Sequence, residues 1–258
     1  MKVLNLGCGN SIINSWVNVD ISPLADNVKK MNFLNGLNFS NESFDVVYMS
    51  HVLEHIPIED VLNVSSEIYR VLRPGGILRI VVPNLEAIAQ EYLQELQLER
   101  DSGEVSWRRS WLTLELLDQM TRRNSGGLMK VWYEEVASQS KEISDFVSWR
   151  VGQRIKTRVD RQLFPKTTFA LPWLASKSLK KSKKRGWFLK EKLRKGEKHL
   201  WMWDELSLKE LSDLTGFSKF TRYSATTSQL SDFFREIDQD ALGNPRKGTS
   251  SIYVEFRK

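Results

Sequence analysis

The stretch Val3-Leu4-Asn5-Leu6-Gly7-Cys8-Gly9 decides the fold, because it predicts a short buried strand that ends in a glycine turn. A second apolar run, Trp16-Val17-Asn18-Val19, ends at Asp20. Gly7 and Gly9 let the backbone turn sharply and let a ligand approach where a Cβ would clash. Asp20 then places a carboxylate at the end of the second strand.

Two further apolar runs extend this pattern. Residues 44–49 predict a strand that closes at Ser50-His51, and residues 77–82 predict one that stops at Pro83. Between them, residues 58–72 carry apolar side chains at three- and four-residue spacings, as amphipathic helices do, and Arg73-Pro74-Gly75-Gly76 ends that helix. Strands that alternate with helices predict a parallel sheet with right-handed crossovers, which is a Rossmann-like, doubly wound α/β fold.

The alternation stops after an amphipathic helix expected over residues 85–98. Residues 101–199 hold six of the nine tryptophans and have a mainly helical pattern. Afterwards, Ser207-Leu208-Lys209-Glu210 matches a capping box that opens a helix ending at Gly216, and strands are expected at 220–223 and 252–256. We therefore expect an α/β core over residues 1–100, a helical and basic insertion over 101–199, and the rest of the core over 200–258.

Composition restricts the environment of the chain. Cys8 is the only cysteine, so no disulfide can form within the chain. No window reaches the ~18 consecutive apolar residues of a membrane span, and the first residues lack a secretory pattern, so we expect a cytoplasmic protein. A formal charge of +6 makes anionic partners plausible.

The glycine turn and Asp20 have a functional and a structural interpretation. Two glycines occur in many strand–helix turns, and an aspartate after a strand is often only a cap. Together, however, they are typical of a site where the carboxylate accepts hydrogen bonds from a ribose diol. A third glycine at dinucleotide spacing and a P-loop motif are both missing from the sequence. This argues against dehydrogenases and kinases, and favours a cofactor without a phosphate.

The ordered motifs in residues 1–85 resemble those of class I S-adenosylmethionine-dependent methyltransferases. The segments that carry the resemblance are Leu4-Asn5-Leu6-Gly7-Cys8-Gly9-Asn10, Val19-Asp20, Ser43-Phe44-Asp45-Val46-Val47, His51-Val52-Leu53-Glu54-His55 and Leu72-Arg73-Pro74-Gly75-Gly76. Arg79 to Glu86 and His199-Leu200-Trp201-Met202-Trp203-Asp204 are similar to the subgroup found with enzymes of polysaccharide biosynthesis.

The resemblance implies which residues bind S-adenosylmethionine. Gly7 and Gly9 would line its methionine part and Asp20 its ribose. The residues expected to bind the cofactor are Asn5, Gly7, Cys8, Gly9, Asp20, Ile21, Asn32, Ser50 and His51. Asn5 and Asn32 stand where many relatives carry an acidic residue; an amide oxygen at Asn32 could still accept from the adenine amine.

The three histidines, His51, His55 and His199, are the candidates for chemistry. Glu54 and His55 could simply orient a loop and cap the next helix, with His51 and His55 on one helical face. Alternatively, His51 lies beside the sulfonium or the acceptor, or His51, Glu54 and His55 bind a divalent metal; we expect no metal. His199 is either packed among aromatic residues or acts as a general base. We predict His51 and His199 to be catalytic.

The insertion suggests where the acceptor binds. Trp107 and Trp111 have the spacing of a helical core, although aromatic residues also stack on sugars or bases. The basic residues 177–198 are either a solvated surface or a contact for an anionic membrane, a nucleic acid or a phosphorylated carrier. No RNA-binding module accompanies them, which makes a nucleic acid the less favoured partner.

The resemblance favours a glycan or glycan-linked acceptor methylated on oxygen. Another small molecule, a peptide or RNA stays an alternative acceptor. A non-catalytic subunit that keeps the cofactor fold is the alternative from a different class.

Overall fold

The computed structural model describes residues 1–135, 140–152 and 196–258. The chain divides into two compact units. The first comprises Met1–Asn84, Leu200–Arg246 and Ser251–Lys258, and the second comprises Leu85–His199 and Lys247–Ser250. The helix after Pro83, which the sequence pattern joined to the α/β core, therefore falls in the second unit.

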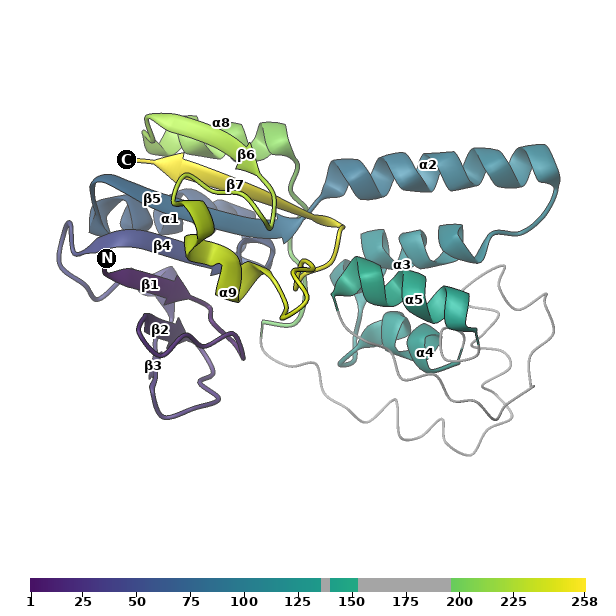
Figure 1. Cartoon of the computed structure of the whole chain (residues 1–258), viewed down its shortest axis with the longest axis horizontal. Coiled ribbons are helices and arrows are strands. Elements are labelled where there is room, and N and C mark those ends of the chain that lie inside the picture. Colours follow the sequence, from purple (N-terminus) through teal and green to yellow (C-terminus); the bar gives the residue numbers. More distant parts are fainter. Residues whose placement is uncertain (136–139, 153–195) are drawn as a thin grey trace. The chain divides into compact units, whose positions relative to one another are not determined.

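The first unit is built on one seven-stranded sheet (Figure 1). Its strands are β1 (Val3–Leu6), β2 (Val17–Asp20), β3 (Val28–Lys30), β4 (Phe44–Ser50), β5 (Leu72–Pro83), β6 (Lys219–Tyr223) and β7 (Ser251–Arg257), in the order β3-β2-β1-β4-β5-β7-β6. Strands β1 to β5 are parallel, and β7 runs antiparallel to both of its neighbours. The predicted α/β fold is confirmed.

Alternate residues of the strands point to opposite faces of the sheet, and each face has its own core. Leu4, Val47 and Leu78 pack on one face with α1 (Val61–Val71) and α8 (Glu205–Thr215). Val46 and Tyr48 pack on the other with Phe234 and Ile237. These last two residues belong to the short helices η7 (Ser231–Phe234) and α9 (Arg235–Asp238), which the sequence pattern did not predict. Helices of four residues are too short to produce a periodic signal.

Two local predictions need correction. Arg73-Pro74-Gly75-Gly76, which the sequence pattern assigned only to the end of a helix, is part of β5, where the pairing with β4 shifts register between Phe44 and Val46. Helix α8 begins at Glu205, and its capping box joins Asp204 to Ser207 instead of Ser207 to Glu210. The Asp204 carboxylate accepts from the Ser207 backbone N–H at 2.8 Å, which an aspartate N-cap does as well as a serine. The predicted end at Gly216 is confirmed.

The second unit contains α2 (Leu85–Ser102), α3 (Trp107–Thr121), α4 (Gly127–Glu135) and α5 (Lys141–Val151). Its core is formed by Trp111, Leu114, Trp132, Ile143 and Val147. Trp111 is fully buried, so it serves the core and is not a platform for a ligand. Most of the basic segment 177–198 lies outside the described residues. None of the described helices is both long and apolar enough to cross a membrane.

Candidate functional site

The predicted cofactor residues of the first unit gather at one edge of its sheet. β1, β2 and β4 are adjacent and parallel, so their carboxyl ends lie together. Gly7 follows β1, Asp20 and Ser50 are the last residues of β2 and β4, and His51 follows at once. Ligands of doubly wound sheets bind at this edge, because the strand ends and the loops that leave them form the crevice there.

The glycine turn after β1 is held against β2. The N–H groups of Gly7 and Cys8 both donate to the Val19 carbonyl, at 2.8 and 3.1 Å. Gly7 has a φ of +70°, and a Cβ on it would lie 2.5 Å from Val52 Cγ2, so packing excludes a side chain there. Gly9 has a φ of +49°, but a Cβ there would meet nothing within 4 Å among the described residues. The space beside Gly9 is therefore open among the described residues.

Asp20 closes the turn from the end of β2. One carboxylate oxygen accepts from the Gly9 N–H at 2.9 Å, and the other accepts from the Ser22 N–H at 2.8 Å. A carboxylate oxygen can accept two hydrogen bonds, so each oxygen keeps capacity for a further donor. A vicinal diol offers two such donors at matching spacing. The geometry therefore suits the ribose role expected for Asp20.

The Asn5 side chain fixes the loop that follows Gly9 through two hydrogen bonds. Its amide nitrogen donates to the Ser11 carbonyl at 2.7 Å and to Asn18 Oδ1 at 3.0 Å. The amide of Asn18 in turn donates to the carbonyls of Ile13 and Trp16. Both Asn5 N–H groups are therefore used within the protein, so only its oxygen could serve the cofactor. The pair of buried asparagines shapes the segment that follows Gly9.

The remaining expected cofactor residues have diverse surroundings. Burial, together with the nearby Asp20 charge, raises the pKa of the Cys8 thiol to about 11, so the thiol stays protonated and is no nucleophile at neutral pH. Asn32 caps η1 (Phe33–Asn35) by accepting from the Leu34 N–H. Ile21 is half-buried directly after Asp20. Contact of these residues with a cofactor stays a prediction.

The backbone N–H and both ring nitrogens of His51 lie next to other protein atoms. Its backbone has a φ of +54°, which is uncommon outside glycine, and its N–H donates to the Val81 carbonyl at 2.8 Å. Nδ1 of the ring lies 3.3 Å from Oε1 of Glu54, and Nε2 lies 3.2 Å from Oγ of Ser251. The ring is 26% exposed. A strained backbone retained at a strand end is typical of functional sites.

Glu54 is fully buried in η2 (Leu53–His55), and its carbonyl accepts from the N–H groups of Leu200 and Trp201. These bonds fix the backbone of η2, from which the Glu54 carboxylate lies beside Nδ1 of His51. A carboxylate at Nδ1 favours the tautomer with the proton on Nδ1, which leaves the Nε2 lone pair for a hydroxyl. A histidine held in this way can act as a general base.

His55 and His199 lie outside the end of β4 that carries His51. η2 begins after His51, so His51 and His55 do not share a helical face as expected. The N-cap of α1 is Asp60, so neither Glu54 nor His55 caps that helix. His199 belongs to the second unit, where its backbone N–H donates to the Gln119 carbonyl. A catalytic role for His199 stays a prediction.

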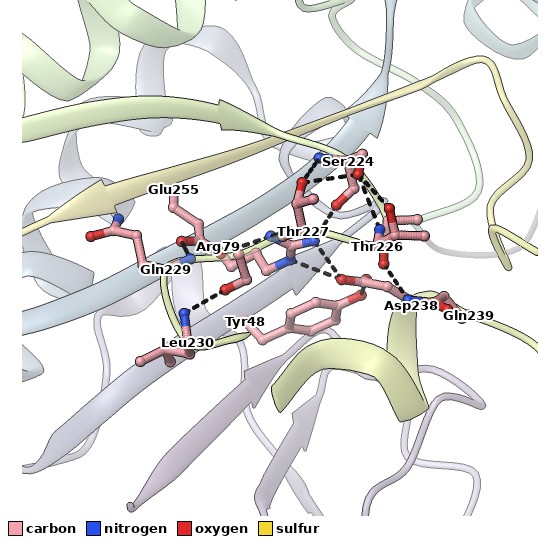
Figure 2. Close-up of polar contacts among 12 residues, drawn as sticks. Tyr48, Arg79, Ser224, Thr226, Thr227, Gln229, Leu230, Asp238, Gln239 and Glu255 are labelled. Atoms are coloured by element: carbon pink, nitrogen blue, oxygen red, sulfur yellow. Dashed lines mark hydrogen bonds and ion pairs between the residues drawn. The ribbon is translucent and has the colours of Figure 1, made fainter. Parts of the chain in front are cut away.

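Sequence reasoning missed a buried charge network beside the site (Figure 2). The Arg79 guanidinium on β5 is fully buried and pairs with Asp238 and Glu255, each at 2.7 Å. The hydroxyl of Tyr48 donates to the other Asp238 oxygen, also at 2.7 Å. Asp238 and Glu255 lie 159 and 176 residues from Arg79 along the chain, so no local motif could reveal them. The network attaches the segment between β6 and β7 to the sheet.

Comparison with known proteins gives a partial match. Residues 4–80 match the family described as "Methyltransferase domain". A protein named "Probable methyltransferase ltbC", from Aspergillus luteorubrus, is 44% identical over 48 residues, which cover 18% of this chain and 17% of that protein. The sterol 24-C-methyltransferase of Candida albicans is 31% identical over 104 residues, covering 31% and 27%.

A solved S-adenosylmethionine-dependent methyltransferase from Archaeoglobus fulgidus aligns over 100% of this chain and 86% of its own, at 12% identity and a TM-score of 0.42. The chain thus spans 17% and 27% of the length of the two curated relatives.

Proposed function

We propose that this chain, whose residues 4–80 match a methyltransferase domain, transfers a methyl group from S-adenosylmethionine to an acceptor. The observation that carries the proposal is the arrangement of Gly9 and Asp20. Gly9 leaves open space beside its backbone, and the Asp20 carboxylate lies next to it with spare acceptor capacity. A phosphate-free nucleoside ligand with a ribose diol needs these features and no pyrophosphate cradle.

For the acceptor we propose a hydroxyl of a glycan or glycan-linked intermediate. The motifs at Arg79 to Glu86 and at His199 to Asp204, which are similar to the polysaccharide-associated subgroup, support this choice. A hydroxyl needs a base because it is a weak nucleophile when protonated. We assign His51 as this base, because Glu54 lies at its Nδ1 and its ring is partly exposed.

We expect the cofactor, His51 and Glu54 each to contribute a separate part of the reaction. When bound, S-adenosylmethionine supplies a methyl group that its sulfonium already activates. Nε2 of His51 would accept the proton that the acceptor hydroxyl loses as its oxygen takes the methyl group. The products are a methyl ether, S-adenosylhomocysteine and a proton that the imidazolium releases to water. The Glu54 carboxylate stabilises the imidazolium while it exists.

Calorimetric titration of the purified chain with S-adenosylmethionine and S-adenosylhomocysteine tests the cofactor assignment. Wild-type protein should bind both, and Asp20→Ala should lose binding because its ribose contacts and its hydrogen bond to Gly9 are gone. Asp26→Ala is the matched control, since Asp26 is exposed in the following loop. A folded wild type that binds neither compound would contradict the proposal and favour a non-catalytic subunit.

A further inference from the structure

A hollow in the first unit lies near the glycine loop. It has a volume of about 520 Å³ and is lined by Ile13 together with residues from the connection between β6 and β7. Ile13 lies four residues after Gly9 and is positioned by the amide of Asn18. In Figure 1, α9, which contributes to the hollow, lies beside the end of β1. The volume is in the range of small-molecule sites.

Residues 238–246 form one wall of the hollow and make a hairpin that is held by backbone hydrogen bonds. The Arg246 N–H donates to the Asp238 carbonyl at 2.8 Å, and the Asp240 N–H donates to the Asn244 carbonyl at 2.8 Å. Asp238 is the buried carboxylate that pairs with Arg79, and the Gln239 amide donates to the Ala225 carbonyl. The hairpin is therefore anchored to the sheet, and its side chains are held at the hollow.

Two arginines supply the hydrogen-bond donors of this hollow. Arg235 is exposed, and its guanidinium forms no hydrogen bond or ion pair with any residue that the structure describes. Arg246 is exposed as well, and its Nε alone is used, donating to the Glu236 carbonyl at 3.2 Å. Planar guanidinium groups match carboxylate and phosphate oxygens by paired hydrogen bonds.

The two carboxylates of the hollow differ in their availability. Asp240 accepts from the N–H groups of Leu242 and Asn244 and from the Asn244 amide, so it serves the hairpin. The exposed Glu236 side chain has no such partners in the described parts of the chain. Glu236 can therefore accept from ligand hydroxyls while the arginines donate to a ligand anion.

We propose that this hollow binds a sugar that carries a carboxylate or phosphate, with Arg235 and Arg246 on the anionic group and Glu236 on hydroxyls. The proposal rests on the methyltransferase function above and names the acceptor class more narrowly, as an acidic sugar. A bare anion would leave Glu236 without a role and facing like charge. A neutral sugar would leave the two guanidinium groups without an acceptor.

Binding of small probes to the full chain tests this proposal without any methyl transfer. Glucuronate, glucose 1-phosphate and glucose are titrated separately and followed by nuclear magnetic resonance of the arginine side chains. Wild-type protein should bind at least one of the two acidic sugars at millimolar concentration and glucose at least tenfold more weakly. Arg235→Gln should weaken the acidic sugar about tenfold, the size expected for a lost charge-assisted hydrogen bond.

Arg222→Gln is the matched control, because it removes the same charge from an exposed arginine that pairs with Glu205 away from the hollow. Binding of only one acidic sugar identifies the anion as carboxylate or phosphate. Equal binding of glucose, unchanged binding by Arg235→Gln, an equal loss in Arg222→Gln, or no binding of either acidic sugar would overturn the proposal. Titration with S-adenosylmethionine on the same samples tests the methyltransferase function separately.

Discussion

His51 Nδ1 lies 3.3 Å from Oε1 of Glu54, a carboxylate that is fully buried. A buried carboxylate is costly unless an opposing charge or dipole stabilises it. Its position behind a strained, partly exposed histidine is explained if Glu54 orients the ring. On the far side of the ring, Oγ of Ser251 lies 3.2 Å from Nε2 of His51, where the hydroxyl can donate or accept a hydrogen bond.

Glu54→Ala should change the tautomer of His51. Without the carboxylate, the neutral ring loses the interaction that favours a proton on Nδ1, and the population with the proton on Nε2 should rise. Nitrogen chemical shifts of the imidazole, measured at a pH where the ring is neutral, report this directly. Glu59→Ala, at an exposed position in the next turn, should leave the shifts unchanged. An unaltered His51 tautomer in Glu54→Ala would argue against the orienting role.

The two glycines of the turn should respond differently to alanine. Gly7→Ala should destabilise the fold by about 2–5 kcal/mol, because it adds left-handed strain to a clash with Val52. Gly9→Ala should cost only about 1–2 kcal/mol of strain but weaken binding of S-adenosylmethionine. Urea denaturation and calorimetry measure the two effects.

Combining Gly7→Ala with Val52→Ala isolates the clash. The double variant should lose less stability than the sum of the two single variants, because Val52→Ala removes the atoms that the new Cβ meets. Strict additivity would mean that strain at Gly7, and not Val52, excludes the side chain.

Removing the Arg79 guanidinium should strongly destabilise the fold. Arg79→Met leaves Asp238 and Glu255 buried without their cation, and should cost about 3–5 kcal/mol of unfolding free energy. Arg222→Met, which breaks an exposed pair, should cost less than about 1 kcal/mol. Equal losses in denaturant titrations would show that the buried network contributes no more than a surface contact.

The Glu67 carboxyl should make the unfolding free energy depend on pH in the acidic range. Hydrogen bonds from Arg70 and from the Leu37 N–H lower the pKa of this carboxyl from 4.5 to about 2. Because the folded-state pKa is the lower one, the stabilisation is present above pH 4.5 and is lost as the pH falls through 2. The unfolding free energy of wild type should therefore exceed that of Glu67→Gln near neutral pH, and the difference should shrink steadily below pH 4.5. A difference that does not change with pH would contradict this origin.

The placement of several residues of the candidate site could be predicted because their sequence signals are local. Gly7 and Gly9 are required by the backbone conformation of one turn, and Asp20 and His51 follow strands whose apolar runs are easily recognised. The role of Asn5 was harder to predict, because an amide that replaces an acid could face either the cofactor or the protein. Its hydrogen bonds to Ser11 and Asn18 depend on the path of a loop without periodicity.

By itself, the sequence determined the parallel part of the sheet, the edge at which the candidate site lies and the positions of the glycine turn and Asp20. These features follow from side-chain alternation and backbone preferences, which act within a few residues. Only the tertiary structure decided that Ser251 meets His51, that Arg79 lies between Asp238 and Glu255, and that Arg235 and Arg246 line a hollow next to Ile13. Such contacts join residues far apart in the chain, and they form because packing of both faces of the sheet brings their strands and loops together.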